Sequence, residues 1–243
     1  MQQGIHESPL NPLPAVVWLL ALPIIASEIY FGLGRLGFIG GAEGIGLRLG
    51  ALERTAFAPE MLIRMWQTGS IDPGQLLRIV TYPFIQGGFA VAAIVLAFLL
   101  ALGKMVATEF RPWALVVLFL GSAIGGALVY TLVVAALVPG GRVAPLVGAY
   151  PAVYGLVGAF TFLLWTRLAQ TGGNRMRAFT LIGALLIFQL VFGLSSALFT
   201  GVDGAFRRLD WLADIAGFAT GFGLSFLVVD GGVARALRHI RQR

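Results

Sequence analysis

The sequence contains 243 residues, of which 58% are hydrophobic and only 12% are charged. Soluble domains carry about 25% charged residues, and the apolar residues here form blocks of membrane-spanning length, so an ordinary water-soluble globule is excluded. The chain has no cysteine, and both histidines, His6 and His239, lie in the terminal tails. Disulfides, thiol catalysis and an imidazole inside the membrane are therefore excluded as well.

Six apolar blocks are long enough to cross roughly 30 Å of hydrocarbon. In chain order they cover residues 16–33, 83–102, 113–138, 146–168, 178–199 and 211–229. We therefore predict an all-α membrane protein, a six-transmembrane-helix bundle formed by one domain over residues 16–229. Residues 1–15 and 230–243 are expected to be a cytoplasmic N-tail and a basic cytoplasmic C-tail, because an even number of crossings leaves both termini on one side.

The basic residues support this topology. Lys and Arg outnumber Asp and Glu by 17 to 11, for a net charge of +6, and they gather at the ends of apolar blocks, which indicates membrane orientation and argues against a nucleic-acid partner. Two arginine clusters, one in the C-tail and one between the fourth and fifth blocks, are expected to face the cytoplasm. Sixteen arginines to one lysine, with no organelle-targeting features, favour a bacterial inner membrane.

We expect the first apolar block to be a retained helix and not a signal peptide. A long first loop follows it, at about residues 34–82. Apolar and charged residues alternate there, which predicts short amphipathic helices lying in the membrane interface. Glu28, near the outer end of the first block, is expected to reach toward the interface and not to act chemically.

The interior of the bundle offers little hydrolytic chemistry. A Ser–His pair needs a histidine, an aspartyl site needs two carboxylates that share a proton, and a zinc site needs clustered ligands. The spans contain only Asp214 and Glu28 as acids, so we predict no metal and no cofactor. Asp214 stands out because an ionisable group in lipid costs about 2.5–3.5 kcal/mol and needs a partner.

Three segments carry a family pattern: residues 77–95 (LRIVTYPFIQGGFAVAAIV), 148–159 (GAYPAVYGLVGA) and 213–221 (ADIAGFATG). They resemble the second, fourth and sixth transmembrane helices of the rhomboid intramembrane serine proteases. The resemblance implies a rhomboid-like fold with the long first loop between its first two helices. It also places Arg78 where the family usually has the arginine of a Trp-Arg pair, so Arg78 is expected to anchor the loop.

The resemblance also implies that the catalytic positions are degenerate. Tyr150 stands at the nucleophile position of the family's Gly-x-Ser-Gly motif, and Asp214 stands at the position of its basic histidine. The positions of the oxyanion donors fall on Gln86, Val91 and Val95, of which only Gln86 can donate a hydrogen bond. The chain thus resembles an inactive member, a pseudoprotease, with no catalytic residue. Tyr154 occupies a position where the family often has an aromatic side chain.

Small residues predict how the two helices that carry these positions pack. Residues at a spacing of about four let helices approach closely in lipid, and we expect such packing from Gly148, Ala152, Gly155, Ala159, Ala213, Gly217 and Gly221. Asp214 would then meet Tyr150 or Tyr154. We predict a Tyr–Asp hydrogen bond at this polar centre, because it would meet part of the carboxylate's need in a low-dielectric setting.

Three functions remain open from the sequence. The first is a pseudoprotease whose partners are the bilayer and the transmembrane segments of client proteins, bound without cleavage. The second is an intramembrane peptidase, a serine-type endopeptidase by family assignment, with a non-standard site. The third is a transport or membrane-complex subunit with Asp214 on a solute path, for which Gln189, Ser195 and Ser196 are the candidate polar neighbours.

Overall fold

The computed structural model describes residues 13–137, 143–180, 182–184 and 209–229. Within these ranges the regular structure is helical, and the only strand-like feature is an isolated bridge between Phe57 and Leu146. Five helices are long and apolar enough to cross a membrane: α1 (Ala15–Arg35), α5 (Phe89–Glu109), α6 (Pro112–Leu137), α7 (Tyr150–Gln170) and α10 (Trp211–Val228). The predicted all-α membrane fold is confirmed. The block predicted at 178–199 lies largely outside the described residues.

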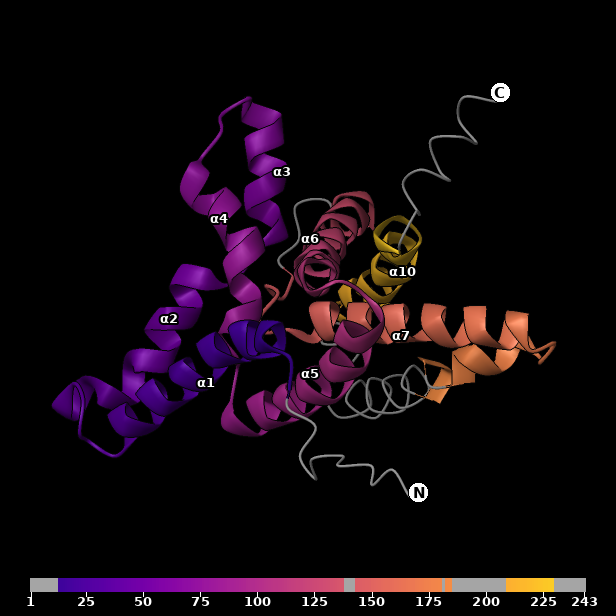
Figure 1. The fold of residues 1–243 in the computed structure, drawn as a ribbon. Coiled ribbons are helices and arrows are strands. Elements are labelled where there is room, and N and C mark those ends of the chain that lie inside the picture. Colours follow the sequence, from indigo (N-terminus) through magenta and orange to yellow (C-terminus); the bar gives the residue numbers. More distant parts are fainter. Residues whose placement is uncertain (1–12, 138–142, 181, 185–208, 230–243) are drawn as a thin grey trace, which may run out of the picture.

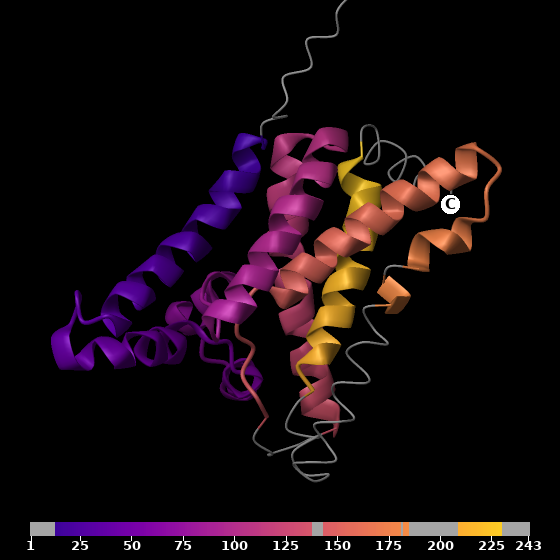
Figure 2. The ribbon, with the colours of Figure 1, turned by 90° about the horizontal axis from the view of Figure 1, so that it is seen from below.

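The centre of the bundle is formed by α6, α7 and α10, which pack against one another (Figure 1). Their facing sides carry a continuous apolar core that includes the fully buried Leu115, Phe119 and Leu156. α5 packs on α7, and α1 packs on α5 at the outside of the bundle. In Figure 2 the starts of α1 and α6 lie toward the same end of the bundle as the ends of α5, α7 and α10.

Two predicted spans have different bounds in the structure. The block at 83–102 becomes α5, which begins at Phe89 because Pro83 lies in the 3-10 helix η2 (Tyr82–Phe84) and Gly88 is extended. α5 continues past Lys104 to Glu109, since a partly buried lysine can extend its amine along an apolar surface. The block at 146–168 becomes α7, which begins only at Tyr150 because Leu146 pairs with Phe57 through two backbone hydrogen bonds.

The first loop folds into short helices, as its pattern predicts: η1 (Gly41–Gly46), α2 (Leu47–Thr55), α3 (Pro59–Thr68) and α4 (Pro73–Thr81). η1 and α2 pack on α1, whereas α3 and α4 pack on α6. Large apolar side chains remain exposed in this loop, among them Trp66, Ile71 and Leu77. Their depth in a bilayer stays a prediction.

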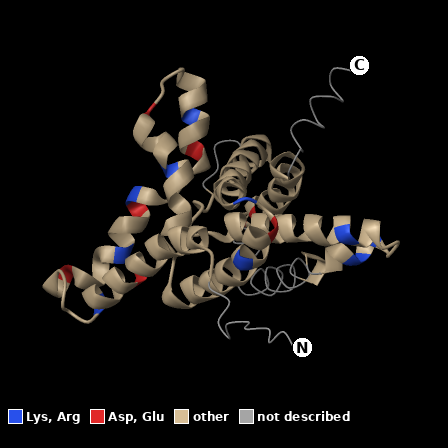
Figure 3. Cartoon of the chain, in the orientation of Figure 1, with Lys and Arg blue, Asp and Glu red and all other residues tan. Residues whose placement is uncertain are grey.

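Apart from the buried Asp214 and Glu28, charged residues lie mostly outside the middle of the bundle. In Figure 3 they gather on the short helices of the first loop and near the far end of α7, while the long helices are mostly uncharged between these regions. At the far end of α7, Arg167 forms an ion pair with Glu109, the last residue of α5. This distribution leaves an apolar belt around the long helices, as a membrane-spanning bundle requires.

Candidate functional site

The candidate site lies where α7 and α10 cross near their N-termini. Gly217 of α10 lies against Pro151 of α7, and one turn further Gly221 lies against Gly155. A Cβ atom built on either α10 glycine would be 2.1 Å from a carbonyl oxygen of α7. The two backbones are therefore in direct contact, a separation that only residues without side chains allow.

The other small residues have different surroundings. Ala152 and Ala159 of α7 are fully buried. Ala213 is also fully buried, and its carbonyl oxygen lies close to Gly126 of α6. Gly148 departs from the expectation: it lies before the first residue of α7, with φ +84°, and takes no part in helix packing. A left-handed backbone cannot belong to the helix, and glycine adopts it at little cost.

This packing brings the predicted polar residues together. Asp214 lies in the first turn of α10 and is only 8% exposed, and Tyr150 and Tyr154 lie at the start of α7, the helix that α10 contacts. The first turn of a helix is favourable for a negative charge, because unpaired backbone N–H groups give it a partial positive charge. Tyr154 is buried and Tyr150 is half-buried. The specific Tyr–Asp hydrogen bond stays a prediction.

Tyr82 belongs to this polar centre, although the sequence reasoning did not single it out. Its side chain is fully buried, and its hydroxyl donates to the carbonyl oxygen of Ala123 at 2.9 Å. Burial, and secondarily the Asp214 carboxylate, raise the pKa of the Tyr82 hydroxyl, because both disfavour a phenolate. Tyr82 therefore stays protonated and ties η2 to the middle of α6. Nothing in the local sequence distinguishes it from a core tyrosine.

Gln86 makes two structural hydrogen bonds. Its side chain is fully buried, its Nε2 donates to the Pro83 carbonyl oxygen at 2.7 Å, and its Oε1 accepts from the backbone N–H of Ala149 at 3.3 Å. A Cβ atom on Gly148 would lie 2.5 Å from the same Oε1. The amide thus fixes the segment that precedes Tyr150. The other two positions are apolar: Val95 is buried in the core, and Val91 packs on its edge.

Glu28 is the clearest wrong expectation. It does not extend to the surface: it is 9% exposed and receives two hydrogen bonds of 2.7 Å from the guanidinium of Arg48. The first loop folds back along α1 and brings Arg48 to the carboxylate, so the charge is met by a side chain of the loop and not by solvent. A loop arginine cannot be paired with a particular helix carboxylate from sequence spacing alone.

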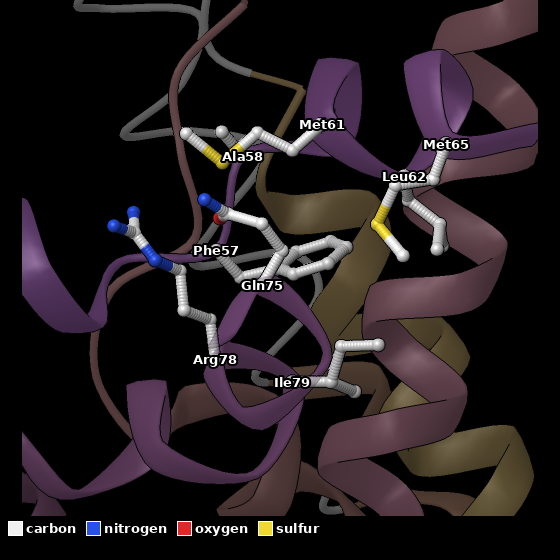
Figure 4. Close-up of a pocket in the computed structure, with 8 residues that line it drawn as sticks. All are labelled: Phe57, Ala58, Met61, Leu62, Met65, Gln75, Arg78 and Ile79. Atoms are coloured by element: carbon white, nitrogen blue, oxygen red, sulfur yellow. The ribbon is translucent and has the colours of Figure 1, made fainter. Parts of the chain in front are cut away.

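Arg78, the expected loop anchor, lies on α4 beside a small pocket between α3 and α4 (Figure 4). Its Nη1 is 3.4 Å from the carbonyl oxygen of Ala56, a long hydrogen bond to the segment that joins α2 to α3. Two methionines, Met61 and Met65, and Gln75 line the same pocket. The contact with Ala56 links two parts of the first loop.

The described residues contain no group of three or more His, Cys, Asp and Glu side chains that could hold a metal ion. The three polar residues suggested for a solute path, Gln189, Ser195 and Ser196, lie outside the described residues. Within the described part of the chain, the polar side chains at or near the α7–α10 crossing include the carboxylate of Asp214, the phenols of Tyr150 and Tyr154, and the buried hydroxyl of Ser122 on α6, which lies against Gly155.

Comparison with known proteins gives two results. The sequence model of the Rhomboid domain matches residues 73–231, which is well over half of the chain. RHOMBOID-like protein 5 of Arabidopsis thaliana is 27% identical over 252 aligned positions, which cover 92% of this chain and 72% of that relative. The matched domain begins at α4 and includes the polar centre.

Proposed function

Since the chain belongs to the rhomboid family, we propose that it is a pseudoprotease, a rhomboid-like membrane protein that binds transmembrane segments of other proteins without cleaving them. The observation that carries this proposal is the pair Tyr150 and Asp214 at the positions of the family's nucleophile and base. A phenol has an ordinary pKa of about 10 and an aspartate of about 3.9. A catalytic acid–base group works best with a pKa near the operating pH, which the histidine of a Ser–His pair has at about 6.5 and an ordinary aspartate does not.

The surroundings of the pair support the same proposal. A rhomboid-type reaction needs donors aimed at a developing oxyanion, and losing one such donor typically costs about 100- to 1000-fold in rate. Gln86 is fully buried and donates to the Pro83 carbonyl oxygen. The side chains of Val91 and Val95 contain no hydrogen-bond donor. We infer that Asp214 serves as a structural acceptor and that a tyrosine hydroxyl, from Tyr150 or Tyr154, donates to it.

The proposed clients are single transmembrane helices that approach the outer face of α5. In the family, lateral access lies between the second and fifth spans, and here α5 exposes the apolar side chains of Phe89, Ile94 and Met105. An apolar outer face fits lipid and a client helix equally well. The surface therefore suits a partner that arrives through the bilayer and not from water.

For localisation we propose a bacterial inner membrane with both termini in the cytoplasm. Lys104, Arg111 and Arg167 lie at or near the ends of α5 and α7 and the start of α6, which fits a cytoplasmic end under the positive-inside rule. The similarity to a plant protein of the same family does not determine on which side of the membrane the two termini lie.

Site-specific photo-crosslinking in native membranes tests client binding. A photoreactive residue at Ile94, 48% exposed on α5, should capture a defined set of single-span proteins at full length. The same residue at Leu22, 54% exposed on α1, is the matched control for nonspecific contact with membrane neighbours. An identical set of captured proteins at both positions would contradict the proposed client site.

The absence of cleavage is tested separately. The protein is incubated in liposomes with a generic rhomboid substrate, beside its Asp214→Ala and Tyr150→Phe variants. We expect no product above the background of empty liposomes in any of the three. Product from the unmodified chain that disappears in both variants would establish a peptidase of unusual mechanism and overturn the pseudoprotease proposal.

A further inference from the structure

Arg48, a residue of the first loop, donates three hydrogen bonds to other parts of the chain. Its Nη1 and Nη2 atoms donate to the two carboxylate oxygens of Glu28 at 2.7 Å each, and Nη1 also donates to the backbone carbonyl oxygen of Gln86 at 2.7 Å. The guanidinium carbon lies 4.8 Å from the centre of the Phe31 ring. One side chain of α2 therefore joins α1 to the segment that precedes α5.

The ion pair is largely buried, so removing it should destabilise the structure around it. The Glu28 side chain is 7% exposed and the Arg48 side chain is 23% exposed. Removing one partner of such a pair leaves the other charge buried and uncompensated. The planar fork of arginine fits both carboxylate oxygens at once, and the point charge of lysine cannot reproduce this geometry.

The contacts continue from Gln86 to the polar centre. The backbone of Gln86 is held by Arg48, and its side chain accepts the N–H of Ala149, the residue directly before Tyr150. A connected series of contacts thus runs from Glu28 through Arg48 and Gln86 to the start of α7. It joins segments that are far apart in the sequence.

Two further hydrogen bonds lie in the same region: the Gly148 N–H donates to the Tyr82 carbonyl oxygen at 3.1 Å, and the Ser27 hydroxyl donates to the Phe84 carbonyl oxygen at 3.3 Å. α2 has no buried residue, so the apolar packing of α2 cannot fix its position. Gly87 and Gly88 separate Gln86 from α5 and have no atom within 4 Å of the position of a Cβ. Because glycine permits many backbone conformations, the contact of Arg48 with the Gln86 carbonyl oxygen adds a fixed point directly before Gly87 and Gly88.

We propose that Arg48 is a positioning residue, through which the first loop fixes the start of α7 and so holds Tyr150 beside Asp214. In Figure 1, α2 lies along the outer end of α1, away from the crossing of α7 and α10. Arg48 thereby acts on the site through Gln86, from a helix that lies outside it. This inference concerns the geometry of the polar centre and is independent of whether that centre belongs to a client-binding protein.

Cysteine protection tests the proposal, since the chain has no cysteine of its own. Ala149 is fully buried, so the thiol of an Ala149→Cys variant should react slowly with a maleimide in proteoliposomes. Adding Arg48→Gln should raise the labelling rate about ten-fold, because local opening becomes more frequent when a fixing contact is lost. Arg54→Gln, an exposed arginine on the same helix, should leave the rate unchanged.

A second reporter separates local release from general destabilisation. Ala114, in the first turn of α6, is also fully buried, and the thiol of Ala114→Cys should stay protected when Arg48→Gln is added. Glu28→Gln should act on Ala149→Cys as Arg48→Gln does, and the two changes together should have less than the product of their effects, since they break one shared contact. Arg48→Lys should restore only part of the protection.

Fluorine NMR of protein labelled with 3-fluorotyrosine gives an independent readout that needs no cysteine. The Tyr150 resonance, assigned with Tyr150→Phe, should shift or broaden in Arg48→Gln and stay unchanged in Arg54→Gln. The proposal is overturned if Arg48→Gln leaves both this resonance and the labelling of Ala149→Cys unaltered. It is equally overturned if Arg48→Gln exposes Ala149→Cys and Ala114→Cys to the same extent.

Discussion

Replacing Gly221 by alanine should force α10 away from α7. The added Cβ would lie 2.1 Å from the carbonyl oxygen of Gly155 and 2.6 Å from its Cα, and both are backbone atoms that cannot rotate away. A carbon atom normally stays about 3.3–3.6 Å from a carbonyl oxygen. The two helices must therefore separate by roughly 1 Å at their crossing, which disturbs the packing around Asp214 as well.

The size of the effect follows from two opposing terms. Overpacking a tight contact costs about 1–3 kcal/mol, whereas Gly to Ala inside a helix gains about 0.8–1.0 kcal/mol of propensity. Because the clash is with backbone atoms at 2.1 and 2.6 Å, we take the upper part of the overpacking cost, about 2–3 kcal/mol, and expect a net loss of about 1–2 kcal/mol. For a chain of this length, 1 kcal/mol corresponds to roughly 2–4 °C in Tm, so the melting temperature of Gly221→Ala should fall by about 2–8 °C.

Thermal unfolding in detergent, followed by the intrinsic fluorescence of the five tryptophans, measures this change. Two of them, Trp165 and Trp211, lie on the two helices concerned. Gly223→Ala is the matched control, because Gly223 lies on the same helix and has no atom within 4 Å of its Cβ position. Its Tm should stay the same or rise slightly. Equal melting temperatures for Gly221→Ala and Gly223→Ala would show that the helices do not meet through their backbones.

Two further substitutions probe the support around the polar centre. Tyr82→Phe removes the hydroxyl that donates to Ala123; the expected cost is about 1 kcal/mol, seen as a lower Tm, and an unchanged Tm would contradict the role of this hydrogen bond. Gly148→Ala should destabilise more than Gly172→Ala by the same measurement. Both glycines have positive φ, so each change costs roughly 1–2 kcal/mol in backbone strain, but only Gly148 also lies against Gln86. Equal losses would refute that contact.

The amino-acid sequence was sufficient to predict those features that depend on composition and on the length of apolar runs. An apolar run of about 20 residues has few alternatives to a membrane helix, because a lipid environment forces the backbone to pair within its own segment. The five membrane helices in the described part of the chain were therefore predictable, and so was the family, from the segments around Gln86, Tyr150 and Asp214. Helix ends were less predictable: α5 begins at Phe89 and not at Pro83.

The membrane-spanning pattern and the replacement of the family's nucleophile and base by Tyr150 and Asp214 are properties of the sequence alone, since each depends only on which residue stands at which position. The tertiary structure alone decided which partners the buried polar groups have. It paired Glu28 with Arg48, placed Gly148 in a left-handed turn and directed Gln86 to Ala149. Such pairings depend on how the first loop returns to the bundle, and many loop arginines could meet a given carboxylate until packing selects one.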